Sequence, residues 1–309
     1  MYAIKAKKLK KTYGDFTAVN GIDLTVKKGS IFAFLGPNGA GKTTTIRMLA
    51  TLIKPDQGEA SLFGYDLIKQ SKAVRQRISL TGQYASIDEA LTGQENLILI
   101  ARLLGFSVGK AKQRASELLE SFGLDDAAKR QVKTYSGGMR RRLDIAASLI
   151  VTPELLFLDE PTTGLDPRSR SQVWQVVQAL AEAGTTILLT TQYLEEADQL
   201  ADHIAVINKG RIVAEGTAAQ LKSSLGSGVL TLQLANQADL MHARSLLAGN
   251  QDIEKITDAK EGELRIKLKQ PQIATQLLVE LGQAGIKVPE FSLGQPSLDE
   301  VFLALTEER

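Results

Sequence analysis

A glycine-rich run between residues 36 and 43 ends in a lysine and a threonine, residue types that can hold phosphate and a divalent metal ion. Glycine stands at the first and sixth positions of this run, which fits the P-loop pattern. Backbone N–H groups of such a loop wrap phosphate, and the following helix N-terminus adds its positive dipole end. The Lys42 ammonium would lie beside the β- and γ-phosphate oxygens, and the Thr43 hydroxyl would bind Mg²⁺. We predict that ATP is bound by Gly36, Asn38, Gly39, Ala40, Gly41, Lys42, Thr43 and Thr44.

A second chemical feature is the acidic pair Asp159 and Glu160, which directly follows the apolar run 155–158. A P-loop needs a carboxylate at the end of a neighbouring strand, and Asp159 would hold Mg²⁺ there through water. Glu160 would polarise the attacking water as general base, a role worth roughly 10²- to 10⁴-fold in rate. The alternative is an acidic pair that opens a solvated loop, but the string 161–164, Pro-Thr-Thr-Gly, continues a specific motif. The two features together predict an ATPase.

The hydrophobic pattern predicts the elements that position these groups. Residues 30–35 are apolar on both faces, as in a buried parallel strand, and run straight into the glycine-rich turn. Apolar residues at helical spacing dominate a block at about 86–150. The remaining elements are half-buried strands at 4–10 and 22–26, helices after Lys42 and after Ser136, strands 155–158, 186–191, 204–207 and 211–214, and a helix 168–183. This pattern indicates an α/β core with an α-helical insertion.

The pattern resets after the Ser- and Gly-rich stretch 223–228. Strands and helices then follow in the order βαββαβ: 229–234, 237–248, 252–258, 263–269, 272–284 and 287–293. That order is typical of the ferredoxin-like split βαβ arrangement. We therefore predict an ATP-binding cassette in residues 1–222 and a small C-terminal α+β domain in residues 223–309.

The composition excludes several kinds of site and partner. The chain has no cysteine, which excludes a disulfide scaffold, a thiol nucleophile and any cysteine-ligated metal, and its two histidines argue against a histidine-rich metal centre. A net charge of +2 creates no field that would draw nucleic acid or anionic lipid. The sequence contains no run of about 20 apolar residues, so we expect a cytoplasmic protein whose membrane contact passes through a partner.

Three further strings make the chain resemble the nucleotide-binding subunits of ATP-binding cassette transporters. Residues 135–139, Tyr-Ser-Gly-Gly-Met, are similar to the signature string of that family, and residues 164–166, Gly-Leu-Asp, to its loop along the dimer partner. Gln83, after a predicted strand, is similar to the glutamine that senses Mg²⁺ and the attacking water. The resemblance covers residues 2 to about 220. It implies a cassette with antiparallel β and α-helical subdomains, acting as a homodimer around two ATP and two Mg²⁺.

The signature string also has a physical rationale. Ser136 can cap the following helix, while Gly137 and Gly138 let its bare N–H groups approach an anion. The resemblance implies that this anion is the γ-phosphate held by the other subunit's P-loop. It further implies that Asp166 faces the ATP site of the dimer.

An aromatic residue near the N-terminus adds one more expectation. The resemblance implies that Tyr13 stacks on adenine, and a packing role in its lysine-rich strand is the alternative.

Two positions depart from the family pattern, and one basic run needs interpretation. Met139 replaces a glutamine, which removes a polar side chain but none of the backbone donors. Gln192 stands where the family commonly has a histidine that touches the γ-phosphate. Glutamine can donate a hydrogen bond but cannot be charged, so we predict slow but real hydrolysis.

The run Arg140–Arg142 is interpreted as a solvated helix face rather than a nucleic-acid site.

A narrower resemblance concerns the daunorubicin-resistance type of drug exporter ATPase. It rests on residues 135–143, 189–198 and 296–305, and glutamine at the switch position is familiar in that group. The resemblance implies multidrug export and antibiotic resistance, driven through a separate transmembrane permease that docks on the helical block. The subunit would then be peripheral on the cytoplasmic face of the cell membrane. We interpret the segment 298–305 as an amphipathic helix that covers the small domain or the dimer interface, rather than as a drug-binding element.

Two other functions remain alternatives at the level of sequence. A soluble ATPase acting on ribosomes or DNA would carry two cassettes or long coiled coils, and this chain has one cassette and no sustained heptads. A regulatory module that binds ATP but hardly hydrolyses it is suggested by Gln192. Turnover of the purified chain with its permease separates this second alternative from an exporter ATPase.

Overall fold

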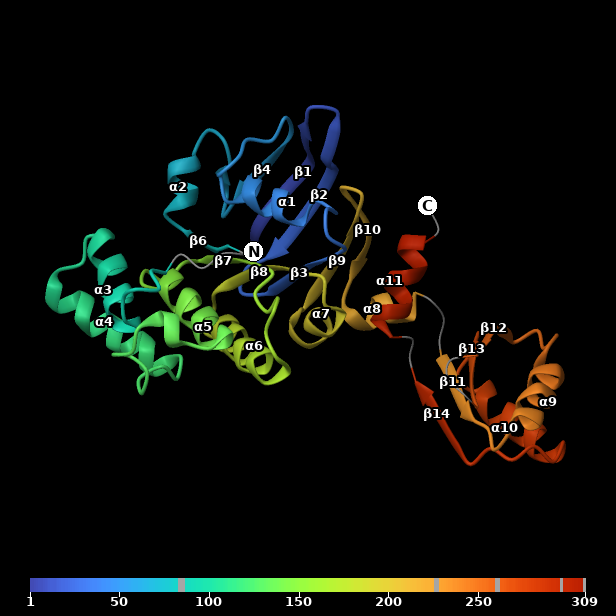
Figure 1. The fold of residues 1–309 in the computed structure, drawn as a ribbon. Coiled ribbons are helices and arrows are strands. Elements are labelled where there is room, and N and C mark those ends of the chain that lie inside the picture. The colour runs from blue at the N-terminus through green and yellow to red at the C-terminus, as the bar shows by residue number, and fades with distance from the viewer. Residues whose placement is uncertain (83–86, 225–227, 259–261, 295–296, 308–309) are drawn as a thin grey trace. The chain divides into compact units, whose positions relative to one another are not determined.

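The chain forms two compact units, Met1–Glu215 and Gly216–Arg309 (Figure 1). The computed structural model describes residues 1–82, 87–224, 228–258, 262–294 and 297–307. The boundary predicted between residues 222 and 223 falls at the end of α8 (Ala218–Ser223), inside the second unit.

The first unit is organised by a six-stranded sheet with the order β10-β9-β3-β8-β7-β6. Its strands are β3 (Ile31–Leu35), β6 (Ile78–Thr81), β7 (Leu155–Asp159), β8 (Thr186–Thr191), β9 (His203–Asn208) and β10 (Arg211–Gly216). The five strands from β9 to β6 are parallel to their neighbours. Every residue of β3, β7 and β8 is buried, as the continuous apolar pattern of these strands predicts. Parallel pairing places the carboxyl ends of all five strands at one edge.

A second, antiparallel sheet of the first unit has the order β2-β1-β4-β5. It comprises β1 (Tyr2–Tyr13), β2 (Phe16–Lys27), β4 (Gln57–Leu62) and β5 (Tyr65–Asp66). Its buried face forms one hydrophobic core with β3 and with α1 (Lys42–Leu49), in which Ile4, Phe34 and Ile46 are at most 1% exposed. α2 (Ser71–Arg75) follows β5 and contributes the buried Val74 to this core. The core fixes the P-loop helix between the two sheets.

The helical block lies in the sequence between β6 and β7. It consists of α3 (Gly93–Leu103), α4 (Val108–Ser121), a 3₁₀ turn η1 (Val132–Thr134) and α5 (Gly137–Ser148). The three α-helices begin at side-chain caps, which are Thr92, Ser107 and Ser136. α6 (Pro167–Glu182) and α7 (Leu194–Leu200) complete the first unit. Caps that are readable in the sequence therefore set the start of the three α-helices of this block.

The second unit contains an antiparallel sheet with the order β12-β13-β11-β14. Along the chain it runs β11 (Gly228–Gln233), α9 (Gln237–Leu247), β12 (Ile253–Asp258), β13 (Glu263–Leu268), α10 (Ile273–Gln283) and β14 (Glu290–Gly294). The last strand begins three residues later than predicted, because Pro289 has no N–H to contribute to a sheet. The final helix α11 (Leu298–Glu307) lies against α8. Within the described residues, each helix is too short or too polar to cross a lipid bilayer.

Candidate active site

Three neighbouring strand ends bring the predicted catalytic groups to one edge of the six-stranded sheet. Gly36 follows β3, Gln192 follows β8, and Asp159 and Glu160 stand at the end of β7. Because β3, β8 and β7 are adjacent and parallel, groups from distant parts of the sequence lie together at their carboxyl ends. Gln83 follows the next strand, β6, and lies outside the described residues.

The P-loop conformation depends on close backbone packing. Gly41 has φ = +103° and precedes α1 without a side-chain cap, so it does not occupy the first N–H groups of that helix. A Cβ at Gly41 would collide with the carbonyl oxygen of Ala18, so both the dihedral angle and the space require glycine. From the other side, the Gly210 N–H donates to the Ala40 carbonyl over 3.0 Å. The loop is thus held between β2 and the turn that joins β9 to β10.

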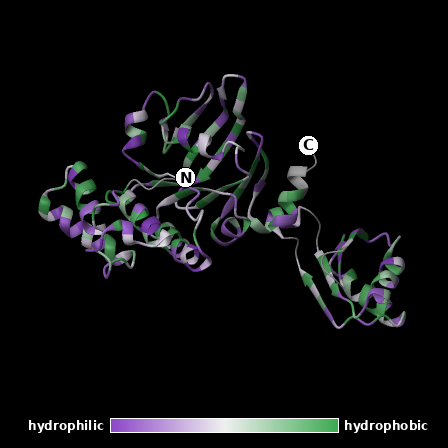
Figure 2. Cartoon of the chain, viewed as in Figure 1, coloured by the Kyte–Doolittle hydropathy of each residue, from purple (hydrophilic) through white to green (hydrophobic). Residues whose placement is uncertain are grey.

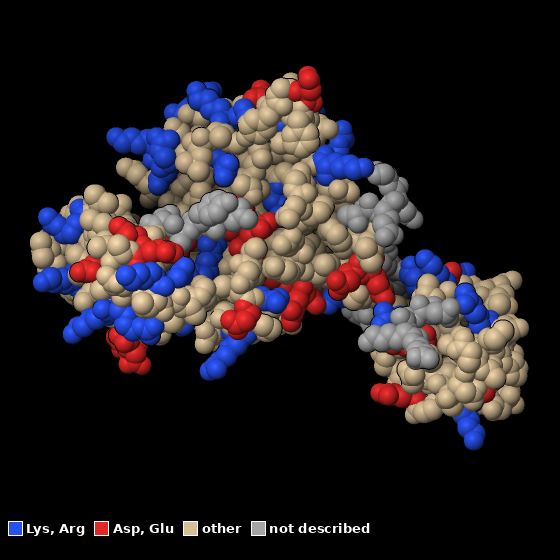
Figure 3. All heavy atoms as spheres, viewed as in Figure 1, with Lys and Arg blue, Asp and Glu red and all other residues tan. Residues whose placement is uncertain are grey.

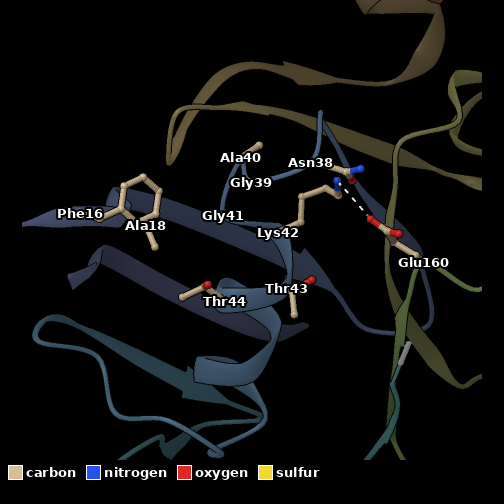
Figure 4. A pocket seen from close by; sticks show the side chains of 10 residues that line it. All are labelled: Phe16, Ala18, Asn38, Gly39, Ala40, Gly41, Lys42, Thr43, Thr44 and Glu160. Atoms are coloured by element: carbon tan, nitrogen blue, oxygen red, sulfur yellow. Dashed lines mark ion pairs between the residues drawn. The ribbon is translucent and has the colours of Figure 1, made fainter. Parts of the chain in front are cut away.

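A cavity of about 330 Å³ opens at this loop (Figure 4). Of the predicted nucleotide-binding residues of the loop, all except Gly36 line it. The full lining is Phe16, Ala18, Asn38, Gly39, Ala40, Gly41, Lys42, Thr43, Thr44 and Glu160. Phe16 and Ala18, both on β2, were not predicted, because no motif marks them. Tyr13 stands opposite Phe16 at the end of the β1–β2 pair, is 50% exposed and does not line the cavity.

The Lys42 side chain is buried at the wall of the cavity, 4% exposed. Its Nζ donates to the carbonyl oxygens of Gly36 at 2.7 Å and Pro37 at 3.1 Å. It also forms an ion pair with Glu160, at 3.5 Å from Oε1 (Figure 4). Burial lowers the pKa of the Lys42 ammonium, and the charge of Glu160 opposes that shift. The cation and the predicted general base therefore face each other where a γ-phosphate would be held.

Glu160 itself has the unusual dihedral φ = +49° for a residue with a side chain. Its N–H donates to the carbonyl oxygen of Thr190 at 3.2 Å and to the hydroxyl of Thr190 at 3.0 Å. The Thr163 hydroxyl donates to Glu160 Oε2 over 3.3 Å. A strained backbone persists only where surrounding groups over-determine it, and it is common at catalytic centres.

Oxygen atoms of the kind that Mg²⁺ prefers meet beside Lys42. The hydroxyls of Thr43 and Thr190 both donate to Asp159 Oδ1, at 3.0 Å and 2.6 Å. The Asp159 carboxylate is 5% exposed. A hydroxyl and a carboxylate are oxygen donors of the kind that fits Mg²⁺. Thr43 and Asp159 are therefore the residues of the described chain that would hold this ion.

The signature string begins α5, as predicted. Ser136 Oγ accepts a hydrogen bond from the Met139 N–H over 3.3 Å. Gly138 packs on the start of α6, where an added Cβ would stand 2.5 Å from Ser169 Oγ. Asp166 caps α6, accepting from the Ser169 N–H at 3.0 Å and its hydroxyl at 2.6 Å. These hydrogen bonds lower the pKa of the Asp166 carboxyl.

Several other predicted site residues lie outside the cavity lining described above: Ser136, Gly137, Gly138, Asp159, Asp166 and Gln192. Gln192 is half-buried at the end of β8. The chain therefore assembles the P-loop and Glu160 around one cavity, and presents α5 and Asp166 elsewhere on the same unit.

The interpretation of the arginine run as a solvated face is wrong. Arg140 Nη1 forms an ion pair with Glu89 at 2.8 Å, and Arg142 Nη1 donates to the Phe122 carbonyl oxygen at 2.8 Å. The Arg141 side chain is 10% exposed and bonds inside the unit. On the face shown in Figure 3, basic and acidic side chains are interspersed over the helical block. The three guanidinium groups hold parts of the chain together.

A buried acid near the site was missed by the sequence reasoning. Glu196, on α7, is 0% exposed, and its Oε1 accepts from Thr162 Oγ1 at 2.8 Å and Trp174 Nε1 at 3.0 Å. Burial raises the pKa of this carboxyl. Its position four residues after Gln192 on a helix was the available signal, but its partners come from α6 and from the loop after Glu160.

Comparisons with known proteins decide the family. A model of the ABC transporter family matches residues 19–163, and a model for the C-terminal domain of DrrA1-3-like ATP-binding proteins matches residues 216–306. The daunorubicin/doxorubicin resistance ATP-binding protein DrrA of Streptomyces peucetius is 58% identical over 304 residues, covering 98% of this chain and 92% of that protein. The chain belongs to the ABC transporter family.

Other relatives agree with this placement. The daunorubicin resistance ATP-binding protein DrrA2 of Streptomyces coeruleorubidus is 48% identical over 309 residues, covering 100% of this chain and 96% of the relative. An ATP-binding cassette solved as a dimer in a post-hydrolysis state, bound to ADP and phosphate, aligns with a TM-score of 0.63 and 26% identity. That alignment covers 69% of this chain and 98% of the solved one. The chain is thus an ABC transporter ATPase of the DrrA type, and the predicted family, ATP binding and cassette fold are confirmed.

Proposed function

We propose that this ABC ATPase is the motor subunit of an exporter: two copies close around two ATP and drive a separate membrane permease. The observations that carry the proposal are the ion pair of Lys42 with Glu160 and the hydrogen bond from Thr43 to Asp159, which join the P-loop helix to the end of β7 beside the cavity. Residues 1–222 would act as the cassette and residues 223–309 as its extension. The strand order of the second unit supports a ferredoxin-like arrangement for that extension.

The ATP-hydrolysing step follows from the side chains around the cavity. The loop N–H groups and the Lys42 ammonium would bind the β- and γ-phosphates, and the fixed carbonyl contacts of Lys42 keep it at the cavity wall. Thr43 and Asp159 would hold Mg²⁺, which neutralises charge that develops on the phosphate oxygens. Glu160 would accept a proton from the attacking water. Gln83, after β6, and Gln192, after β8, would orient that water and the γ-phosphate.

Dimerisation is supported by the arrangement of α5. Ser136 and Gly137 are exposed at a helix N-terminus, which favours an anion, but they do not line the cavity of their own chain. We propose that they contact the γ-phosphate bound by a second copy, with Asp166 alongside. The related cassette solved as a dimer supports this assembly. Tyr13 would stack on adenine, and Phe16, which stands opposite it on β2, lines the cavity.

The permease is proposed to dock on the helical block. Four large apolar side chains are about half exposed or more at the end of α3 and in the turn into α4: Leu99, Leu103, Leu104 and Val108. Figure 2 shows hydrophobic residues along α3 and the turn that follows it. Exposed apolar patches of this kind mark interaction sites. The subunit would reach the cytoplasmic face of the membrane through this contact, and no nucleic-acid partner is proposed.

The cargo is proposed from the relatives' names. Proteins 58% and 48% identical over nearly the whole chain are described as daunorubicin/doxorubicin and daunorubicin resistance proteins. We therefore propose export of a drug or another hydrophobic molecule.

The proposal is tested with Glu160→Gln, which keeps the shape of the side chain but removes the base. We expect ATP turnover to fall by at least about 100-fold, within the range for loss of general base catalysis. The variant should still bind ATP, and with ATP it should elute as a dimer from a sizing column. Unchanged turnover would refute the assignment of Glu160 as general base. A monomer at every ATP concentration would count against the proposed dimer.

A further inference from the structure

The Arg141 guanidinium is bonded to three backbone carbonyls at the carboxyl ends of two neighbouring strands, β6 and β7. Its Nε donates to the Pro161 carbonyl oxygen at 2.9 Å, and its Nη1 donates to the Gly82 carbonyl oxygen at 2.8 Å. Its Nη2 reaches the Asp159 carbonyl oxygen at 3.3 Å. Asp159 and Pro161 are the residues on either side of Glu160. Gly82 is the residue before Gln83.

The charge of Arg141 is balanced locally. Nη1 also pairs with Asp144 Oδ2 at 3.3 Å, one turn further along α5, and the Asp144 side chain is 3% exposed. Burial lowers the pKa of the Arg141 guanidinium, and the charges of Asp144, Glu196 and Asp159 oppose that shift. A buried ion pair gives weak net stability by itself, since its desolvation is costly. The ion pair with Asp144 therefore does not explain why the Arg141 guanidinium donates to three backbone carbonyls.

The explanation lies in the backbone of Glu160. The peptide group between Asp159 and Glu160 is held at both ends, its carbonyl by Arg141 and its N–H by Thr190. The Thr163 N–H donates to the carbonyl oxygen of Glu160 at 3.3 Å, and Arg141 holds the next carbonyl, that of Pro161. These bonds over-determine a residue whose φ is +49°. They set the direction in which the Glu160 carboxylate leaves the backbone.

We propose that Arg141 is a positioning residue for ATP hydrolysis: it fixes Glu160 and the turn before Gln83 to the signature helix α5. The inference rests on the proposed role of Glu160 as general base. Because Arg141 lies on the helix whose N-cap is Ser136, it ties the water-activating group of one chain to the surface offered to the second copy. Arginine suits this place because its planar fork directs several donors at fixed angles, whereas lysine is a point charge on a flexible stem.

Arg142 provides a matched control on the same helix. Its Nη1 donates to the carbonyl oxygens of Phe122 and Gly123, at 2.8 Å and 3.4 Å, within the helical block. Burial lowers the pKa of its guanidinium too. Arg142→Gln therefore removes arginine hydrogen bonds to backbone carbonyls without touching the strand ends. Comparing Arg141→Gln with Arg142→Gln separates positioning from the general cost of losing a packed arginine.

The first measurement is steady-state hydrolysis by the full chain, with binding of a fluorescent ATP analogue. Arg141→Gln should lower kcat by roughly 10- to 100-fold, because small displacements of a catalytic group have effects of that size. KM and analogue affinity should change by less than about threefold, since the P-loop is untouched. Arg142→Gln should keep kcat within about threefold of wild type. The kcat of Arg141→Lys should lie between those of wild type and Arg141→Gln. Emission from Trp174, the only tryptophan, reports whether each variant keeps its packing against Glu196.

The second measurement is a double-mutant cycle with Glu160→Gln, using single-turnover hydrolysis of labelled ATP. If Arg141 acts through Glu160, Arg141→Gln should reduce the residual rate of Glu160→Gln by less than about threefold. The proposal would be overturned if Arg141→Gln slowed Glu160→Gln by the same factor by which it slows the wild-type chain. It would also be overturned if the kcat of Arg141→Gln were no lower than that of Arg142→Gln. Wild-type turnover by Glu160→Gln alone would instead refute the proposed general base. The two failures are thus distinguishable.

Discussion

The helices α1 and α5 both begin at glycine-rich strings, yet their N-termini are built differently. α1 starts after Gly41 with no side-chain cap, and the buried ammonium of Lys42 stands at its first position. α5 starts after Ser136, whose hydroxyl accepts the Met139 N–H, and an exposed glycine stands at its first position. The first end lines a cavity together with Glu160, whereas the second lies outside that lining.

The difference teaches how one fold can offer two kinds of anion site. The α1 end carries its own cation and its own cavity, so a single chain can hold phosphate there. The α5 end offers N–H groups and a hydroxyl, and the cation of its first turn, Arg140, is paired with Glu89, so we propose that it takes a phosphate presented from outside. The proposed dimer, in which each α1 site is completed by the other chain's α5, would account for both helix ends. Breaking the α1 end should therefore weaken ATP binding by the single chain, and breaking the α5 end should prevent association of two chains.

The largest expected effect is at the α1 end. Lys42→Ala removes the cation from the cavity wall and leaves Glu160 without its ion-pair partner. We expect the affinity of the single chain for ATP to fall by about 10- to 150-fold, the usual value of a hydrogen bond to a charged group, and turnover to fall further. Binding of a fluorescent ATP analogue to the monomer measures this loss. Affinity within about threefold of wild type would mean that phosphate is held elsewhere.

The α1 end was predictable from sequence, and the reason is physical. A phosphate loop is built by consecutive residues, so the short sequence from Gly36 to Thr43 is enough to predict the whole loop. The acidic pair Asp159 and Glu160 was readable because it ends an apolar strand. Parallel strands have their carboxyl ends at the same edge of a sheet, and this rule alone predicts that the acidic pair lies near Lys42.

Arg141 shows what the sequence could not reveal. Arg141 donates to the backbone carbonyls of Gly82, Asp159 and Pro161. Every residue has a backbone carbonyl, so the sequence does not show which ones an arginine will bind. The run of three arginines therefore reads as a solvated face until the tertiary structure places it. Phe16 was missed for a similar reason, since its place in the cavity depends on where β2 passes the P-loop.

An intermediate effect is expected at the α5 end, where capping and association can be separated. Ser136→Ala removes the cap and should cost about 1 kcal/mol of unfolding free energy. Ser136→Asp keeps a good cap, so its stability should stay within about 0.5 kcal/mol of wild type, but it places a negative charge where phosphate would arrive. In a Glu160→Gln background we expect the Asp variant to remain monomeric with ATP on a sizing column. Dimerisation equal to that of Glu160→Gln alone would refute the role assigned to this helix end.

The smallest effect is expected at the third helix end, that of α6, where Asp166 is a fully exposed cap. Hydrogen bonds from the Ser169 hydroxyl and N–H hold the pKa of Asp166 below its usual value near 3.9. A carboxyl whose pKa is lowered in the folded state stabilises it fully above the unfolded pKa, and this contribution is lost as pH falls through the folded pKa. Asp166→Asn keeps a cap without the charge, so the gap in unfolding free energy between wild type and variant should be constant above about pH 5 and shrink below about pH 4. Urea denaturation across this range measures the gap. A gap that widens on acidification would show that the Ser169 bonds do not favour the charged form, and α6 would then be capped without help from charge.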